Sequence, residues 1–160
     1  MLPTTRGILV LLLSAPIIAL GTWLNGMEWV GWAYASLVLI LFALDWILAG
    51  RVERFDVARV HDTKLSLGAE NAVTVSVRNR SRRGTRFTVR DEAPEAFKIE
   101  TRILEGEVPP LGTWTGVYHL QPLRRGDYQF GDLHLRWLGP LKLILRQGRV
   151  KAAEPVKVYP

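Results

Sequence analysis

The sequence has no cysteine and very few charges in its first 50 residues, and each shortage limits what the protein can be. Without cysteine there is no disulfide framework and no cysteine-based thiol or zinc site. Residues 1–50 hold three charged side chains, Arg6, Glu28 and Asp45, whereas residues 51–160 hold the other 20 Lys and Arg and the other 13 Asp and Glu. This separation predicts a lipid-embedded segment followed by a basic, water-exposed domain.

Motifs for catalysis and nucleotide binding are also absent. The sequence has no phosphate-binding loop, no nucleophile elbow and no dinucleotide fingerprint. His119 and His134 could be neighbours on adjacent strands, but a zinc site needs three or four convergent ligands. We therefore expect no metal, no cofactor and no enzymatic activity. The alternative is a membrane-bound hydrolase that uses His119, His134 and nearby carboxylates.

Two stretches that are almost free of charge are long enough to cross a bilayer, at about 7–24 and 29–50. Pro16 should kink the first, and the few residues between the stretches leave room only for a tight turn. Residues 1–50 are thus predicted to form a transmembrane helical hairpin. The alternatives are a signal peptide cleaved near Ala19-Leu20-Gly21 and a buried helical hairpin of a soluble protein.

Lys and Arg residues flank the hairpin on one side only. Arg6 precedes the first span, Arg51 and Arg54 closely follow the second, and the loop between the spans has none. The positive-inside rule then places both ends, and the domain at 51–160, on the cytoplasmic side of the inner (plasma) membrane. With the inverted topology the domain would be an extracytoplasmic adhesive sandwich.

Asp45 is the one residue inside either span that carries a charge at neutral pH. Such residues are often functional, because burying a carboxylate in lipid is costly. Asp45 lies about one helical turn from the Arg51 end of its span, where insertion costs less and a partner such as Arg51 is within reach. A structural or interfacial role is therefore predicted.

Residues 51–160 alternate apolar and polar side chains with a period of two, which is typical of antiparallel strands with one buried face. We expect strands near 55–61, 63–67, 72–79, 85–91, 97–104, 113–121, 127–137 and 141–147, with a ninth at 156–159. The buried positions change parity between Phe130 and Leu133, which predicts a β-bulge at Gly131, after a turn at Gly126. Strands of this number and length predict an immunoglobulin-like antiparallel β-sandwich.

Arginines concentrate in two of the predicted turn regions. The residues are Arg80, Arg82, Arg83 and Arg86 in one region, and Arg124 and Arg125 in the other. Such clusters can be solvated turns, or they can contact a protein or anionic lipid headgroups. Nucleic acid is not expected, because no aromatic residues are interleaved with the arginines as a stacking platform would require.

Several motifs resemble a known family. They are RRGDYQFG at 124–131, LHLR at 133–136, GPL at 139–141 and VKVYP at 156–160. Their order and spacing resemble the family called "domain of unknown function 58", and the resemblance covers essentially the whole chain. It implies two membrane helices, an immunoglobulin-like domain and, as a partner, the MoxR-type AAA+ ATPase whose genes commonly accompany the family.

Two departures from the family's pattern stand out. Lys142 occupies a position where the family usually has glycine. Family members also continue after the V-Y-P motif into a domain similar to a von Willebrand factor A domain, whose metal-site motif is absent here. We therefore expect the anchor and β module of a longer protein, acting in protein interaction without catalysis. The division expected is a helical hairpin at 1–50 and a β-sandwich at 51–160.

Overall fold

The computed structural model describes residues 2–24 and 27–159 and divides into two compact units. The first unit combines the segment up to Gly50 with Trp137–Arg146, and the second combines Arg51–Arg136 with the segment from Gln147 onward. One boundary between the units falls after Gly50. Trp137–Arg146, which the sequence assigned to the sandwich, belongs to the helical unit instead. Asn25 and Gly26 of the predicted hairpin loop, and Pro160, lie outside the described residues.

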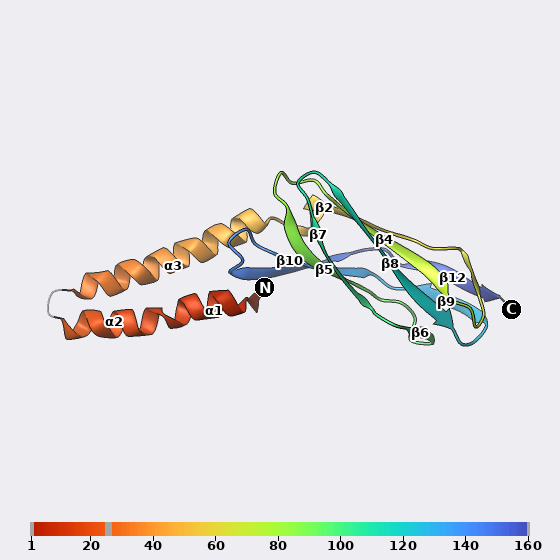
Figure 1. Ribbon diagram of the computed structural model, residues 1–160, viewed down its shortest axis with the longest axis horizontal. Coiled ribbons are helices and arrows are strands. Elements are labelled where there is room, and N and C mark those ends of the chain that lie inside the picture. Colours follow the sequence, from red (N-terminus) through yellow and green to blue (C-terminus); the bar gives the residue numbers. More distant parts are fainter. Residues whose placement is uncertain (1, 25–26, 160) are drawn as a thin grey trace. The chain divides into compact units, whose positions relative to one another are not determined.

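Three helices form the hairpin of the first unit: α1 (Thr5–Leu12), α2 (Ser14–Trp23) and α3 (Glu28–Ala49) (Figure 1). Thr5–Trp23 and Glu28–Ala49 are each long and apolar enough to cross a membrane. The break after Leu12 lies four residues before Pro16, whose ring clashes with the carbonyl at that position. Gly50 ends α3 with a φ of 68°, a conformation that glycine adopts without strain.

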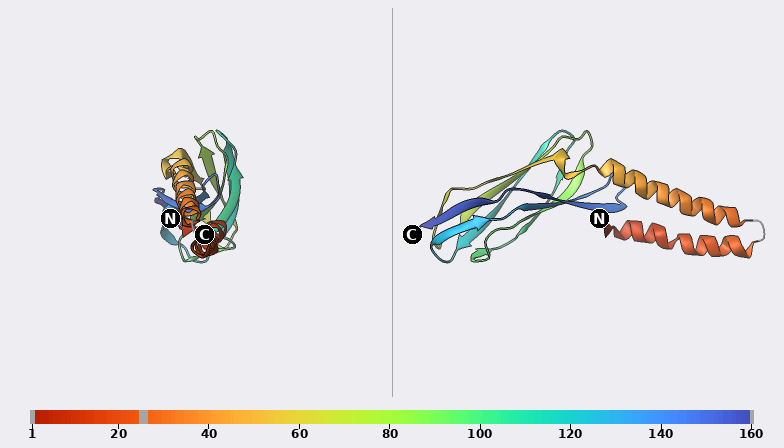
Figure 2. Two further views of the ribbon diagram at one scale, coloured as in Figure 1. Left: turned by 90° about the vertical axis from the view of Figure 1, so that its left-hand side faces the viewer. Right: turned by 180° about the vertical axis from the view of Figure 1, so that it is seen from behind.

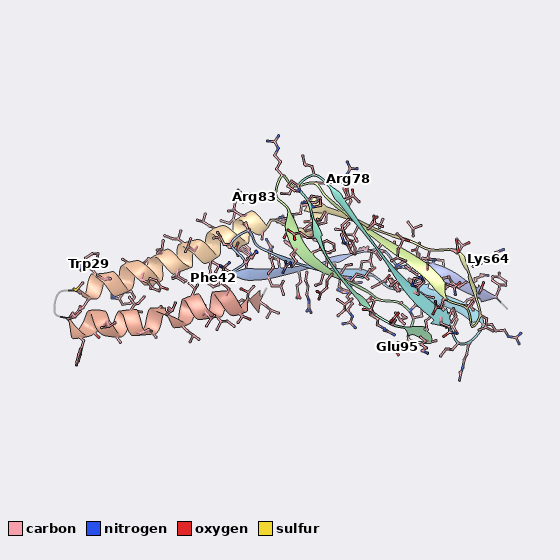
Figure 3. The ribbon with its side chains drawn as sticks, viewed as in Figure 1. Trp29, Phe42, Lys64, Arg78, Arg83 and Glu95 are labelled. Carbon is pink, nitrogen blue, oxygen red and sulfur yellow. The ribbon has the colours of Figure 1, made fainter. Side chains whose placement is uncertain are left out.

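Glycines let the helices of the hairpin approach closely. A Cβ on Gly31 would lie 3.0 Å from Cα of Ile18, and one on Gly7 would lie 3.0 Å from Cζ of Phe42. Phe42 points from α3 toward α1 (Figure 3). Small residues at such positions are typical of helices that pack through their backbones in lipid, where no hydrophobic effect drives association.

The second unit is an immunoglobulin-like antiparallel β-sandwich, which confirms the fold class predicted from the sequence. One sheet has the order β2-β4-β8-β6, and facing strands run in the orders β11-β10-β5-β7 and β3-β12-β9. Figure 2 shows β12 and β9 side by side. The strands are β2 (Phe55–Val60), β3 (Lys64–Ser66), β4 (Asn71–Asn79), β5 (Thr85–Asp91), β6 (Phe97–Ile99), β7 (Ile103–Val108), β8 (Thr113–Pro122), β9 (Gly126–Phe130), β10 (Leu133–Leu138), β11 (Ile144–Val150) and β12 (Glu154–Tyr159).

Two segments that were each predicted as one strand contain two strands, and the two strands belong to different sheets. The segment predicted at 97–104 contains β6, which pairs with β8, and β7, which pairs with β5. The segment predicted at 127–137 contains β9, which pairs with β12, and β10, which lies beside β5. In place of the predicted β-bulge, the chain leaves one sheet and enters another at Gly131 and Asp132. The parity change is real, because Phe130 and Leu133 are both fully buried.

A buried ion pair joins the two layers of the sandwich. Arg59 on β2 donates from Nε and Nη2 to both carboxylate oxygens of Asp91 on β5, at 2.9 and 2.8 Å. The Tyr118 hydroxyl on β8 donates to the same carboxylate at 2.8 Å, and burial, together with the Asp91 charge, raises the pKa of that hydroxyl. Arg59 and Asp91 are 8% and 4% exposed, so removing either partner leaves a buried polar group unsatisfied.

We predict that Asp91→Asn lowers the free energy of unfolding by about 3–5 kcal/mol, because the buried Arg59 charge loses its bidentate counterion and keeps only the half-exposed Glu154 at 3.6 Å. The matched control is Asp56→Asn, which breaks an ion pair with Arg80 whose side chains are 46% and 63% exposed. That loss should stay below about 1 kcal/mol. Denaturant unfolding of the full chain in detergent, followed by the circular dichroism of the β-sheet, measures both. Equal losses would contradict the prediction.

Candidate functional site

Asp45 is fully buried, and its carboxylate binds a turn of the chain about a hundred residues away. The backbone N–H of Leu141 donates to Oδ1 at 2.6 Å, and those of Leu143 and Ile144 donate to Oδ2 at 2.9 and 3.0 Å. These three amides stand in place of Arg51, the partner expected from the sequence. Hydrogen bonds to backbone N–H groups satisfy the acceptor oxygens of a buried carboxylate, which would otherwise be costly to bury.

Thr4, at the start of the first helix of the hairpin, binds the same turn. Thr4 donates from its backbone N–H to the Leu143 carbonyl at 2.9 Å, and its hydroxyl donates to the Lys142 carbonyl at 2.6 Å. The same hydroxyl oxygen caps α1 by accepting from Gly7 N–H at 3.1 Å. Leu2 and Pro3 form a short strand, β1, opposite Leu145 and Ile144. We call the set of contacts that Thr4 and Asp45 make with residues 139–145 the turn clasp.

Gly139 is required by the turn clasp, because a Cβ at this position would collide with the Asp45 carboxylate. Trp137 completes the region by donating from its indole N–H to the Ala49 carbonyl at 2.8 Å, at the end of α3. Asp45 therefore holds this turn through hydrogen bonds, and its partners are backbone amides. The sequence offers no signal for them, since a backbone amide is present at every residue except proline.

We predict that Asp45→Asn exposes the turn at 139–145 to solvent exchange. An asparagine side chain turns one acceptor oxygen into an NH₂ donor, which would face backbone donors in the turn. Hydrogen exchange of the full chain in nanodiscs should show faster exchange of the amides of Leu141, Leu143 and Ile144. Glu28→Gln, at the exposed acidic residue of α3, is the control. Unchanged protection in Asp45→Asn would show that the carboxylate does not hold the turn.

The structure separates the arginines that the sequence grouped as one possible surface. Along the β4–β8 pair, Arg78 lies opposite Thr113 and Asn71 lies opposite Leu120. The turn after Arg78 and the turn after Leu120 therefore lie at opposite ends of the sandwich, the first with Arg80, Arg82 and Arg83, the second with Arg124 and Arg125. Figure 3 shows Arg78 and Arg83 at one end and Lys64 at the other. Arg86 belongs to neither turn, because it lies on β5 opposite Glu107.

A hollow that the sequence analysis did not identify lies on the outer face of strands β5, β10 and β11. Its volume is about 480 Å³, and its polar lining includes Arg90, Glu92, His134, Arg136 and Arg149. Nε2 of His134 lies 2.7 Å from a Glu92 oxygen. Within residues 2–24 and 27–159, neither Arg90 nor Arg136 is in an ion pair. The hollow therefore carries an excess of positive charge.

Two acidic residues organise the edge of this hollow. Glu92 accepts from the backbone N–H of Asp132 at 3.1 Å, and this bond together with His134 lowers the pKa of Glu92. Asp132 accepts from Ala152 N–H at 3.0 Å and from Arg149, and these bonds lower the pKa of Asp132. Both carboxylates are thus committed to holding the strands, which leaves Arg90 and Arg136 as the charges available to a ligand.

The histidines do not form the pair that the hydrolase alternative required. His119 lies on β8 and His134 on β10, which belong to different sheets. Both alternate with buried core residues, so the two rings are on opposite outer faces of the sandwich. Among the described residues, no cluster of His, Asp or Glu could hold a metal ion. Of the histidines and carboxylates that the hydrolase alternative would use, His134 and Glu92 lie within hydrogen-bond distance of each other.

The two glycines singled out in the sequence have different roles. Gly126 begins β9 with a φ of 152°, which favours glycine at this turn. Gly131 has no such conformation, but a Cβ there would approach the side chain of Glu92 to 2.5 Å. Its carbonyl also accepts from Nη2 of Arg59 at 2.8 Å. Gly131 is therefore needed for space at the crossing between sheets.

Comparisons with known proteins find resemblance in solved structures alone. No family model matches the chain, and no curated protein matches it. The CARDB domain of the PF1109 protein from Pyrococcus furiosus is 14% identical, with a TM-score of 0.46, over 66% of this chain and 87% of that one. A FixG-related protein from Vibrio parahaemolyticus is 9% identical, with a TM-score of 0.43, over 68% and 100%. SSP-19 from Caenorhabditis elegans is 12% identical, with a TM-score of 0.39, over 59% and 94%.

Proposed function

We propose that the chain is a non-enzymatic membrane anchor and protein-interaction module of a larger membrane-associated assembly. The observation that carries the proposal is the arginine-lined hollow, an open face with unpaired charge on a domain joined to two apolar helices. A rigid sheet that displays unpaired arginines suits recognition of an acidic partner surface. Glu92 and Asp132 hold the strands through backbone bonds, which fits binding better than proton transfer.

We further propose a MoxR-type AAA+ ATPase as the partner, on the basis of the family resemblance. The conformation of Lys142 supports that resemblance. Its φ is 59°, in the left-handed region that glycine adopts most readily, and this is the position where the family usually has glycine. If the family builds this turn with the same backbone conformation, a positive φ at this position accounts for its usual glycine.

The interaction is testable by co-purification of the tagged full chain with the MoxR-type ATPase of the same source. Arg90→Glu/Arg136→Glu should reduce the retained ATPase by on the order of tenfold, since reversed charges repel an acidic surface. Arg124→Glu/Arg125→Glu makes the same change of net charge at a distant turn and should retain the ATPase. Failure of the unaltered chain to retain it, or equal loss in both variants, would count against the proposal.

The cytoplasmic side of the inner membrane is proposed for the sandwich, because Lys and Arg flank the helices at that end. Green fluorescent protein fused after Pro160 should fluoresce, and alkaline phosphatase fused at the same place should be inactive. Active phosphatase there would overturn this topology and favour the extracytoplasmic adhesive sandwich. Matched fusions after Met27 should give the reverse pattern, which controls for expression of each reporter.

A further inference from the structure

We propose that one end of the sandwich, defined by residues 51–56, 78–84 and 109–112, is a membrane-contact surface for anionic lipid headgroups, with Leu111 as its apolar contact. This inference rests on the proposed anchor. We call this end the proximal end, because Arg51 directly follows Gly50 at the end of α3. The other end, with Leu123, Arg124 and Arg125, is the distal end.

The covalent connection keeps the proximal end near the bilayer. The backbone N–H of Arg80 donates to the Arg54 carbonyl at 2.8 Å, so the arginine turn is fixed to the segment that leaves α3. Arg54 is the fifth residue after Ala49, the last residue of α3, and five fully extended residues span about 18 Å. Arg54 therefore stays within about 18 Å of the helix end, and Arg80 is hydrogen-bonded to it. The distal end lies about 25 Å further along the strands.

The proximal end has the charge that an anionic leaflet attracts. Residues 51–56 and 78–84 hold six arginines and two acidic residues. One acidic residue, Asp56, is neutralised by Arg80 through bonds of 2.7 and 2.6 Å. Arg78, Arg82 and Arg83 are exposed. Clusters of this kind close to the cytoplasmic end of a membrane helix are attracted to anionic lipids.

A single buried side chain holds the arginine turn against an exposed apolar turn. Asn79, which is 1% exposed, donates from Nδ2 to the Arg83 carbonyl at 2.8 Å and to the Pro109 carbonyl at 3.2 Å. Its Oδ1 accepts from the Ser81 N–H at 2.9 Å, and the Ser81 carbonyl accepts from Leu111 N–H at 2.9 Å. The two turns therefore form one rigid surface.

Leu111 is displayed on that surface at a conformational cost. Its φ is 52°, which is uncommon for a residue other than glycine, and its side chain is 60% exposed. Core packing does not explain a leucine at this position, because the side chain faces away from the core. Strained residues that persist on a surface are candidates for function. An apolar side chain beside arginines is the combination by which peripheral surfaces enter the headgroup layer.

Site-specific spin labelling tests the proposal, because the chain has no cysteine and any introduced one is unique. The full chain with Leu111→Cys is labelled with a nitroxide in nanodiscs of phosphatidylcholine alone or mixed with phosphatidylglycerol. We expect severalfold lower accessibility to a water-soluble nickel chelate in the mixed discs. Leu123→Cys is the matched control, since Leu123 is also 60% exposed and also lies beside two arginines. Its accessibility should be equal in both discs.

The arginine contribution is tested on the same labelled protein. Arg82→Glu/Arg83→Glu should abolish the difference between the two discs, and Arg124→Glu/Arg125→Glu should preserve it. High salt should reproduce the first result without any substitution, which excludes misfolding as its cause.

A label at Leu37→Cys, on an exposed face of α3, reports whether the anchor itself is in lipid. If position 37 is lipid-exposed but position 111 is equally water-accessible in both discs, the membrane-contact surface is overturned while the anchor stands. If position 37 is water-accessible, the anchor fails and the contact surface fails with it.

Discussion

The first unit depends on the three hydrogen bonds that the Asp45 carboxylate accepts from backbone N–H groups. An apolar helix can tolerate a buried carboxylate only if hydrogen bonds satisfy it, and residues 139–145 supply those bonds. Thr4 binds the same turn from the other helix of the hairpin. The two helices thus meet a common backbone segment, and their ends are fixed by polar contacts where apolar packing alone would leave them free to slide.

The sandwich solves a similar problem in a different way. Arg59 and Asp91 place a charged pair in its interior, and Tyr118, Gly131 and Ala152 satisfy their remaining donors and acceptors. A buried ion pair adds little net stability compared with apolar residues. Any arrangement of the sheets that separated Arg59 from Asp91 would, however, leave two buried charges without partners. Each unit therefore contains a buried carboxylate, Asp45 in the first and Asp91 in the second, whose hydrogen-bond partners fix the local geometry.

Much of this architecture could be read from the sequence, and the missing parts have a common physical reason. The spans and most strands follow from hydropathy and from period-two alternation, which are local properties. Alternation does not say which sheet a strand joins, so β6 with β7 and β9 with β10 were merged. For the same reason Arg90, Arg136 and Arg149 could not be grouped in advance. The partners of Asp45 could not be predicted, because every residue except proline has a backbone N–H and the sequence does not show which of them would bind.

The conformation of the arginine turn depends on Asn79, a residue that sequence reasoning passed over as one polar residue at the end of a strand. Its side-chain amide donates to the carbonyls of Arg83 and Pro109, so it holds the arginine turn and the turn that carries Leu111 in fixed positions relative to each other.

The turn clasp also has a consequence for biosynthesis. The chain is made from its N-terminus, so Thr4 and Asp45 leave the ribosome long before residues 139–145 exist. Throughout that interval the Asp45 carboxylate lacks its three amide donors, so it must stay hydrated or unsatisfied until residues 139–145 are made. The first unit is therefore completed only after most of the sandwich, from β2 to β10, has been made, although its helices are synthesised first.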